Sequence, residues 1–185
     1  MPNIAKSVIV SLLVLFSALA FTVHLRLWQA FDWESLVALQ SALPRSFDMP
    51  FSLLTLIGSA EITGLIFLAF VICAPSAQRL PLVLTLGIAT LLELVGKIFI
   101  DQPAPPHDLF RYIPLLPLIL SAQVNTKFSF PSGHALRSIF ICITLAKLIS
   151  ASRWNRTSKR VLYLALALFE IIMLISRVYL AEHWT

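Results

Sequence analysis

The sequence predicts an all-α fold, a single polytopic membrane helix bundle over residues 1–185 with five membrane spans. Hydrophobic residues make up 58% of the chain and charged residues only 12%, whereas roughly a quarter of the residues in a soluble domain are charged. The mean hydropathy is +0.88. The apolar residues also gather in runs about as long as the ~20 residues that a membrane helix needs. Together these features indicate an integral membrane protein with one domain.

Five apolar segments carry this prediction. They cover roughly residues 4–21, 51–73, 80–100, 132–149 and 161–180. The first segment, with Lys6 at its start and Ala18-Leu19-Ala20 near its end, also resembles a cleavable signal peptide. Its apolar run continues through Val23 and residues 25–28, which favours an uncleaved span.

The region between the first two spans, residues 24–50, permits two interpretations. Its aromatic residues Trp28, Phe31 and Trp33 suit a membrane interface. In one interpretation it forms a short helix along the membrane surface. The residues that would share one face of that helix are Trp33, Leu36, Val37 and Leu43. In the other interpretation it is a plain connecting loop, and both stay open.

The distribution of basic residues predicts the orientation of the bundle. Residues 153–160, between the last two spans, carry four basic residues and no acidic one. Cytoplasmic loops are enriched in Lys and Arg, so this connection is expected inside the cell, together with Lys6 and Arg79. Residues 24–50 and 101–131 then lie outside. We therefore expect a multi-pass protein of the plasma (inner) membrane.

The remaining composition argues against several kinds of partner. The net charge of +5 does not indicate nucleic acid, because the basic residues form no stripe with interleaved aromatic residues. Cys73 and Cys142 lie in apolar segments without metal-ligand spacing, and we interpret them as small hydrophobic residues. The sequence also lacks a cluster of carboxylates that would hold magnesium.

The most informative stretch is Pro131-Ser132-Gly133-His134, which directly precedes an apolar run. Ser132 can cap a helix, and Gly133 lets a ligand approach the backbone closely. The free N–H groups of the first helical turn favour an anion such as phosphate. His134 adds a group that can give or take a proton near neutral pH. An ordinary capped helix is the alternative.

The predicted orientation brings several ionisable side chains to the outer ends of three spans. Ionisable groups cost roughly 2.5–3.5 kcal/mol at the centre of a membrane helix, and their convergence near a phosphate-type helix start therefore indicates a shared site. The residues are Lys97 near the end of the third span, His134 and Arg137 at the start of the fourth, and Arg177 and His183 at the end of the fifth.

Each of these residues also has a simpler interpretation. Glu93 lies four residues before Lys97 and can neutralise it. Arg137 can contact either substrate or the membrane surface. Glu170 shares a helix face with Arg177, and we interpret it as a buried partner within the bundle, while Glu61 suits packing or hydrogen bonding.

These motifs resemble those of the type 2 phosphatidic acid phosphatase superfamily, which are membrane lipid phosphate phosphatases related in active-site plan to vanadium haloperoxidases. The residues 131–134, followed by Ser176-Arg177, five residues and His183, resemble the family's second and third motifs. The first motif of the family is Lys, six residues and Arg-Pro. In this chain Lys97 is followed after six residues by Ala104-Pro105, so Lys and Pro match and the Arg is missing.

The resemblance implies a mechanism without metal or cofactor. His183 would attack phosphorus and form a phosphohistidine, and His134 would protonate the leaving oxygen and later activate water. The residues expected to bind the phosphate are Lys97, Ser132, Gly133 and Arg177. Arg111, in the same outer loop as Ala104, is a further candidate for phosphate binding, and Lys127 is a weaker one.

The resemblance also predicts features that lie past the last residue. The family carries an Asp shortly after the nucleophilic His, and that position would fall just beyond Thr185, as would the sixth span. We therefore expect either a truncated sequence or a protein without this orienting carboxylate.

The expected partners are membrane lipids and a lipid phosphate or diphosphate. Residues 112–120 form an apolar stretch with two prolines that suits the acyl boundary of the membrane. By resemblance, the candidates are undecaprenyl diphosphate, phosphatidylglycerophosphate and phosphatidic acid, and a phosphotransferase would use the same residues. Two other classes stay open: a catalytically impaired scaffold, and a transporter that uses Glu61, Glu93 and Glu170.

Overall fold

The computed structural model describes residues 2–114 and 128–184. These residues form helices and no strands, apart from one isolated bridge between Pro103 and Phe128, which confirms the predicted fold class. The longer helices are α1 (Pro2–His24), α2 (Gln29–Ala42), α3 (Asp48–Thr55), α4 (Ala60–Cys73), α5 (Ser76–Phe99), α6 (Gly133–Ala151) and α7 (Arg156–Tyr179). Short 3-10 turns cover Arg45–Phe47, Leu56–Gly58 and His107–Leu109.

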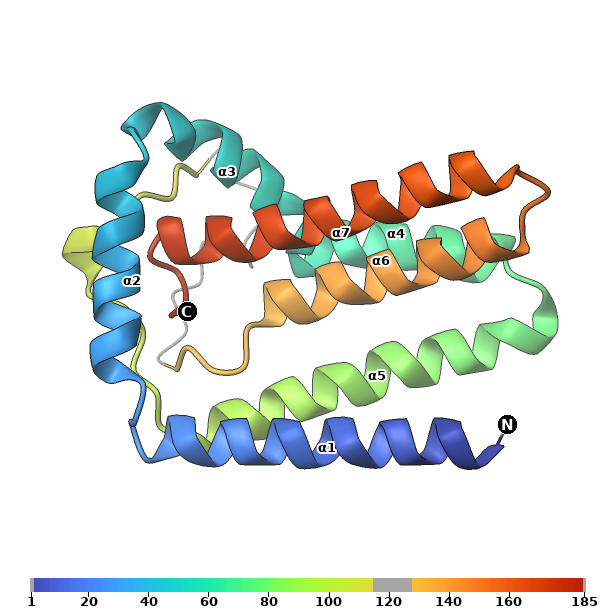
Figure 1. Cartoon of the computed structure of the whole chain (residues 1–185), viewed down its shortest axis with the longest axis horizontal. Coiled ribbons are helices and arrows are strands. Elements are labelled where there is room, and N and C mark those ends of the chain that lie inside the picture. The colour runs from blue at the N-terminus through green and yellow to red at the C-terminus, as the bar shows by residue number, and fades with distance from the viewer. Residues whose placement is uncertain (1, 115–127, 185) are drawn as a thin grey trace.

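Among the described residues, four helices are long and apolar enough to cross a membrane: most of α1, and all of α5, α6 and α7. They run along the length of the molecule, while α2 crosses one end (Figure 1). A fifth span is formed if the segment Arg45–Gly58 and α4, which meet at a bend of 47°, are counted together. The second predicted span is therefore broken. Ser59 caps α4 at the break by accepting a hydrogen bond from the Ile62 amide at 3.3 Å.

The region 24–50 contains the predicted surface helix, α2, but with a different buried face. Asp32, Leu36 and Gln40 are buried at spacings of four residues, whereas the side chains of Trp33 and Val37 are exposed. The predicted face is therefore correct for Leu36 and wrong for Trp33 and Val37, because the polar side chains of α2 have partners in the bundle. Gln40 shows this most clearly, since its amide nitrogen lies 2.7 Å from the Tyr179 carbonyl oxygen at the end of α7.

The centre of the bundle is the packing of α6 against α7, with α4 and α5 beside α6. Polar groups stabilise this contact. Ser138 donates a hydrogen bond of 3.0 Å to the Glu170 carboxylate, and the Cys142 thiol lies 3.7 Å from the other oxygen of that carboxylate. Glu170 is thus a partner within the bundle, with Ser138 and Cys142 rather than Arg177 as its contacts.

Candidate active site

The ends of α5 and α7 and the start of α6 lie at the end of the bundle that α2 crosses (Figure 1). Lys97 lies in the last turn of α5, Ser132–His134 begin α6, and Arg177 lies in the last turn of α7. His183 follows α7 in a tight turn. One region of the molecule is therefore built from three segments that are far apart in the sequence: the end of α5, the start of α6, and the end of α7 with the turn that follows it.

The start of α6 has the predicted cap. The Ser132 hydroxyl oxygen accepts a hydrogen bond from the Ala135 amide at 3.3 Å. Two glycines allow neighbouring groups to approach this turn closely. A Cβ atom at Gly133 would collide with the Glu93 carboxylate, and one at Gly58 would lie 3.0 Å from the His134 carbonyl oxygen. The sequence predicted that a ligand could approach the backbone at Gly133. In this structure the Glu93 carboxylate makes that approach.

Glu93 links two of the cations on different helices. Its carboxylate lies 3.0 Å from the Lys97 ammonium and 3.2 Å from the Arg137 guanidinium, and the side chain is buried. Arg137 also donates a hydrogen bond of 2.7 Å to the Gly58 carbonyl oxygen, next to the break in the second span. The pairing of Lys97 with Glu93 is confirmed, and Arg137 belongs to this cluster rather than to the membrane surface.

Gly133→Ala is expected to destabilise the protein by about 1–3 kcal/mol, the usual cost of forcing extra atoms into a packed site. The new methyl group would collide with the Glu93 carboxylate, which is held by Lys97 and Arg137. Thermal unfolding in detergent would measure the change. Gly64→Ala is the matched control, because a Cβ there meets nothing within 4 Å. An equal effect of both substitutions would contradict the expected collision.

The turn after α7 folds His183 back towards Arg177. Ala181 adopts a left-handed backbone conformation (φ 57°), and the Arg177 carbonyl oxygen accepts hydrogen bonds from the amides of Glu182 at 3.1 Å and His183 at 3.2 Å. Arg177 is 4% exposed and forms an ion pair with the buried Glu182 carboxylate. Glu182 was missed by the sequence analysis, because no motif marked it.

His183 has an acceptor that orients its ring. Its Nδ1 atom lies 2.7 Å from the Ser129 carbonyl oxygen and 3.2 Å from the Ser129 hydroxyl. Since a carbonyl oxygen can only accept, we assign the proton to Nδ1, which leaves a lone pair on Nε2. Ser129 was also missed by the sequence analysis, which sought a carboxylate in this role. A main-chain oxygen fixes the same tautomer.

The surroundings of His183 keep its ring neutral at pH 7. Burial, followed by the positive charge of Arg177, holds the pKa of His183 well below its ordinary value of 6.5, against the opposing effect of the hydrogen bond to Ser129. A neutral imidazole with its proton on Nδ1 is the nucleophilic form, because its Nε2 atom keeps a lone pair.

His134 lies in the first turn of α6 and is 6% exposed. Its Nε2 atom is buried and has no hydrogen-bond partner among the described residues. A buried polar nitrogen without a hydrogen-bond partner is rare in folded proteins, because it costs free energy. It therefore marks His134 as a group kept available for a ligand or a proton.

A cavity of about 370 Å³ reaches His183 and Ser132 from between α1, α2 and α7. Most of its wall is apolar, with Leu19 from α1, Phe31 from α2 and Leu174 from α7. The cavity therefore combines a polar end that carries the predicted nucleophile and cap with walls suited to a hydrocarbon chain.

The structure does not bring Arg111 to this cavity. Its guanidinium donates hydrogen bonds of 3.0 Å to the Tyr179 hydroxyl and 3.2 Å to the Gln40 carbonyl oxygen, and it lies 5.0 Å from the centre of the Tyr179 ring. These contacts attach the loop to α2 and α7. The Arg111 guanidinium therefore binds groups of the protein, and the structure gives it a structural role instead of the predicted phosphate contact. Lys127 and residues 115–120 of the apolar stretch lie outside the described residues.

Within residues 2–114 and 128–184, no group of three or more His, Cys, Asp or Glu side chains is arranged to hold a metal ion. The groups available at the site are two imidazoles, three cations, two carboxylates and the first turn of a helix. Such a set can bind phosphate, supply a nucleophile and transfer protons.

A membrane helix bundle with this arrangement of groups defines a membrane phosphatase. Residues 78–185, more than half of the chain, match the PAP2 superfamily, and the chain therefore belongs to that family. Its PAP2-type fold implies hydrolysis of lipid phosphates.

A solved structure has a similar fold. It is described as the crystal structure of the first transmembrane PAP2 type phosphatidylglycerolphosphate phosphatase from Bacillus subtilis. The two chains are 23% identical, with a TM-score of 0.72, and the similarity covers 95% of this chain and 84% of the other. The search of curated proteins found no match.

Proposed function

We propose that this protein hydrolyses a lipid phosphate or diphosphate at the extracytoplasmic membrane face, through a phosphohistidine on His183 and without a metal ion. The observation that carries the proposal is the ring of His183, whose Nδ1 atom lies 2.7 Å from the Ser129 carbonyl oxygen. That contact leaves Nε2 as a nucleophile beside the buried Arg177.

The proposed reaction has two displacement steps. In the first, Nε2 of His183 attacks phosphorus while the bond to the leaving oxygen breaks, and His134, after taking up a proton, gives it to that oxygen. In the second, His134 takes a proton from water, the resulting hydroxide attacks the phosphohistidine, and the N–P bond breaks to release inorganic phosphate. Arg177, Lys97 and the N-terminal turn of α6 stabilise the negative charge that develops on the phosphoryl oxygens.

The distribution of basic residues supports the proposed facing. The connection between α6 and α7 contains Arg153, and α7 begins at Arg156, at the end of the bundle opposite α2 (Figure 1). If this basic end is cytoplasmic, then the end that carries His183 lies outside.

The cavity beside His183 supports a lipid substrate, because its walls are largely apolar and it lies next to α1, whose side chains are mostly exposed. The similar solved structure is named as a phosphatidylglycerolphosphate phosphatase, which makes this lipid a candidate beside phosphatidic acid and undecaprenyl diphosphate. A phosphotransferase would share the first step and replace water by a second lipid or sugar.

The test is phosphate release by the purified full chain in detergent, with each candidate lipid and with a strong chelator present. We expect release of inorganic phosphate from at least one lipid, at a rate that the chelator does not change. Loss of activity in the chelator would contradict the metal-independent mechanism. Transfer of labelled phosphate to an added lipid alcohol would identify a phosphotransferase, and no turnover of any candidate would favour a scaffold.

A further inference from the structure

The Glu93 carboxylate lies beside groups that are expected to bind phosphate. Glu93 is 6% exposed, and one of its carboxylate oxygens lies 3.0 Å from the Lys97 ammonium. The same oxygen lies so close to the backbone of Gly133 that a Cβ atom there would collide with it. A cation and the first turn of a helix are groups that favour an anion. The protein therefore places a negative charge of its own at two of the groups proposed to bind phosphate.

This carboxylate and a bound phosphate compete for Lys97. A phosphate held by Lys97 and the first turn of α6 would lie beside the negative charge of Glu93, and like charges repel. Because the side chains of Glu93 and Lys97 are largely buried, salt screens this repulsion only weakly. Lys97 is therefore fully available to phosphate only when the Glu93 carboxylate moves away from it.

Arg137 gives the Glu93 carboxylate a second partner. Its guanidinium lies 3.2 Å from the other carboxylate oxygen of Glu93. Arg137 is itself held in place, because its Nε atom donates a hydrogen bond of 2.7 Å to the Gly58 carbonyl oxygen. A buried charge without a partner would be strongly unfavourable. Since each carboxylate oxygen has its own cation, Glu93 can release Lys97 and keep Arg137 as its counterion.

The two cations act unequally on the predicted nucleophile. Burial, followed by the positive charge of Arg177, lowers the pKa of His183, and the charges of Lys97 and Arg137 lower it further. Of these last two, Lys97 has the larger effect. This order fits Lys97 as a ligand of the phosphate at His183 and Arg137 as the more distant partner of Glu93.

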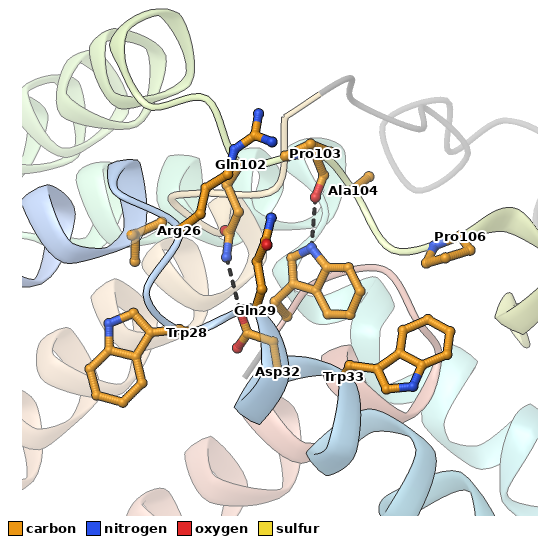
Figure 2. A pocket seen from close by; sticks show the side chains of 11 residues that line it. Arg26, Trp28, Gln29, Asp32, Trp33, Gln102, Pro103, Ala104 and Pro106 are labelled. Atoms are coloured by element: carbon orange, nitrogen blue, oxygen red, sulfur yellow. Dashed lines mark hydrogen bonds between the residues drawn. The ribbon is translucent and has the colours of Figure 1, made fainter.

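A neighbouring cavity, of about 330 Å³, is less suited to a small anion (Figure 2). It shares Trp184 with the cavity described above. Among its described wall residues the cation is Arg26, which forms an ion pair of 2.9 Å with Asp101 and is about half exposed. The Arg26 side chain runs away from the buried Asp32 carboxylate (Figure 2). A small anion is therefore expected to bind at Lys97 rather than in this cavity.

We propose that Glu93 is an internal competitor of phosphate for Lys97. Phosphate binding displaces the carboxylate from Lys97, while Arg137 keeps it as an ion pair. After hydrolysis the carboxylate returns to Lys97 and promotes the release of inorganic phosphate. Glu93 and Arg137 are thus positioning residues that act through Lys97. The inference rests on the proposed function and adds to it a means of limiting inhibition by the product.

The first test measures the Kd of orthovanadate by isothermal titration calorimetry, with the full chain in detergent. Glu93→Gln keeps the shape of the side chain and removes the competing charge. The apparent affinity falls with the fraction of molecules that can bind. If Glu93 occupies Lys97 in about nine-tenths of the molecules, Glu93→Gln should therefore lower Kd about tenfold. Inhibition of turnover by inorganic phosphate should strengthen by the same factor.

Two matched controls remove a charge elsewhere. Glu170→Gln removes a carboxylate from the same bundle, where its contacts are Ser138 and Cys142. Arg26→Gln removes the cation of the neighbouring cavity. Both should keep the Kd of the natural chain. A Kd that is unchanged or higher in Glu93→Gln would overturn the inference while the proposed function stands.

A double-mutant cycle with Arg137→Gln separates exchange of the carboxylate from simple attraction between charges. In the natural chain, loss of Arg137 leaves Lys97 as the partner of Glu93, so Arg137→Gln should raise Kd about tenfold. In the Glu93→Gln background no carboxylate remains to be moved, and Arg137→Gln should change Kd by no more than about twofold. The same factor in both backgrounds would mean that Arg137 attracts the anion directly, and would overturn the inference.

The outcome for the natural chain keeps the two proposals apart. Orthovanadate binding that Glu93→Gln does not tighten contradicts the role of Glu93 alone. A natural chain that neither binds orthovanadate nor releases phosphate from a lipid would count against the proposed function, and the inference would fall with it. If Arg137→Gln does not fold, the change in Kd of Glu93→Gln still decides whether its carboxylate competes with the anion.

Discussion

His183→Ala is expected to reduce phosphate release by roughly 10⁴- to 10⁶-fold, the usual range for loss of a catalytic nucleophile. Alanine has no lone pair that can attack phosphorus. The neighbouring groups cannot replace it, because Ser129 only orients the ring through its carbonyl oxygen. Release of inorganic phosphate from a lipid phosphate is the first measurement.

Trapping of the phosphoenzyme makes this prediction specific. Labelled substrate is mixed with the protein and quenched in alkaline detergent, because the N–P bond of a phosphohistidine survives base and breaks in acid. The natural chain should carry label and His183→Ala none. His107→Ala is the matched control, since His107 is an exposed residue that packs on Phe110. Label that persists on His183→Ala would mean that another residue is the nucleophile.

The positions of the helices could be predicted from the sequence because a membrane imposes long apolar runs. The start of α6 at Gly133, with Ser132 as its cap, agrees with the prediction, and so do the lengths of α5 and α7 to within a few residues. The signals used for these predictions are local in the sequence. A run of apolar residues indicates the length of a span, and a capping residue indicates where the helix starts. The break at Gly58 and Ser59 was not predicted; α3, on one side of it, packs on α7.

The buried faces of the helices were harder to predict, because apolar side chains in a membrane also face lipid. Ser138 and Ser176 are fully buried, whereas Ile143 and Leu174 are exposed. Small polar residues therefore mark the contacts between these helices better than large apolar ones do. Apolar periodicity therefore selects some lipid-facing or exposed residues, as in α2, where Leu36 of the predicted face is buried but Trp33 and Val37 are exposed.

The candidate site was partly predictable because its charged and titratable residues lie in a mostly apolar sequence. Histidine and the cations stand out in an apolar sequence, and Lys97, His134, Arg177 and His183 were identified in this way. Ser129 and Glu182 were not, because one acts through its main-chain oxygen and the other through a turn after α7. Such roles depend on how the chain folds, and residue type does not reveal them.

Arg177→Gln is expected to lower activity by roughly 10²- to 10³-fold, the usual cost of removing one group that stabilises the transition state. It should also destabilise the protein by about 3–5 kcal/mol, because the buried Glu182 carboxylate would lose its partner. Activity alone would therefore not separate a role in phosphate binding from a role in folding. The ion pair itself offers a way to separate them.

Glu182→Gln should destabilise the free protein in the same way, because it leaves the buried Arg177 without its counterion. A bound anion could then take the place of that carboxylate. Orthovanadate resembles the phosphoryl group in the transition state of phosphoryl transfer. We therefore expect it to raise the melting temperature of Glu182→Gln more than that of the natural chain. The measurement is thermal unfolding in detergent with and without the anion.

The double variant Arg177→Gln, Glu182→Gln completes the argument, because it removes both charges together. Replacing a buried ion pair by neutral groups is often close to neutral for stability, so the double variant should regain much of the stability that Arg177→Gln loses. If Arg177 binds the phosphate, activity should nevertheless stay as low as in Arg177→Gln. Recovery of activity together with stability would show that Arg177 serves only to hold the turn that carries His183.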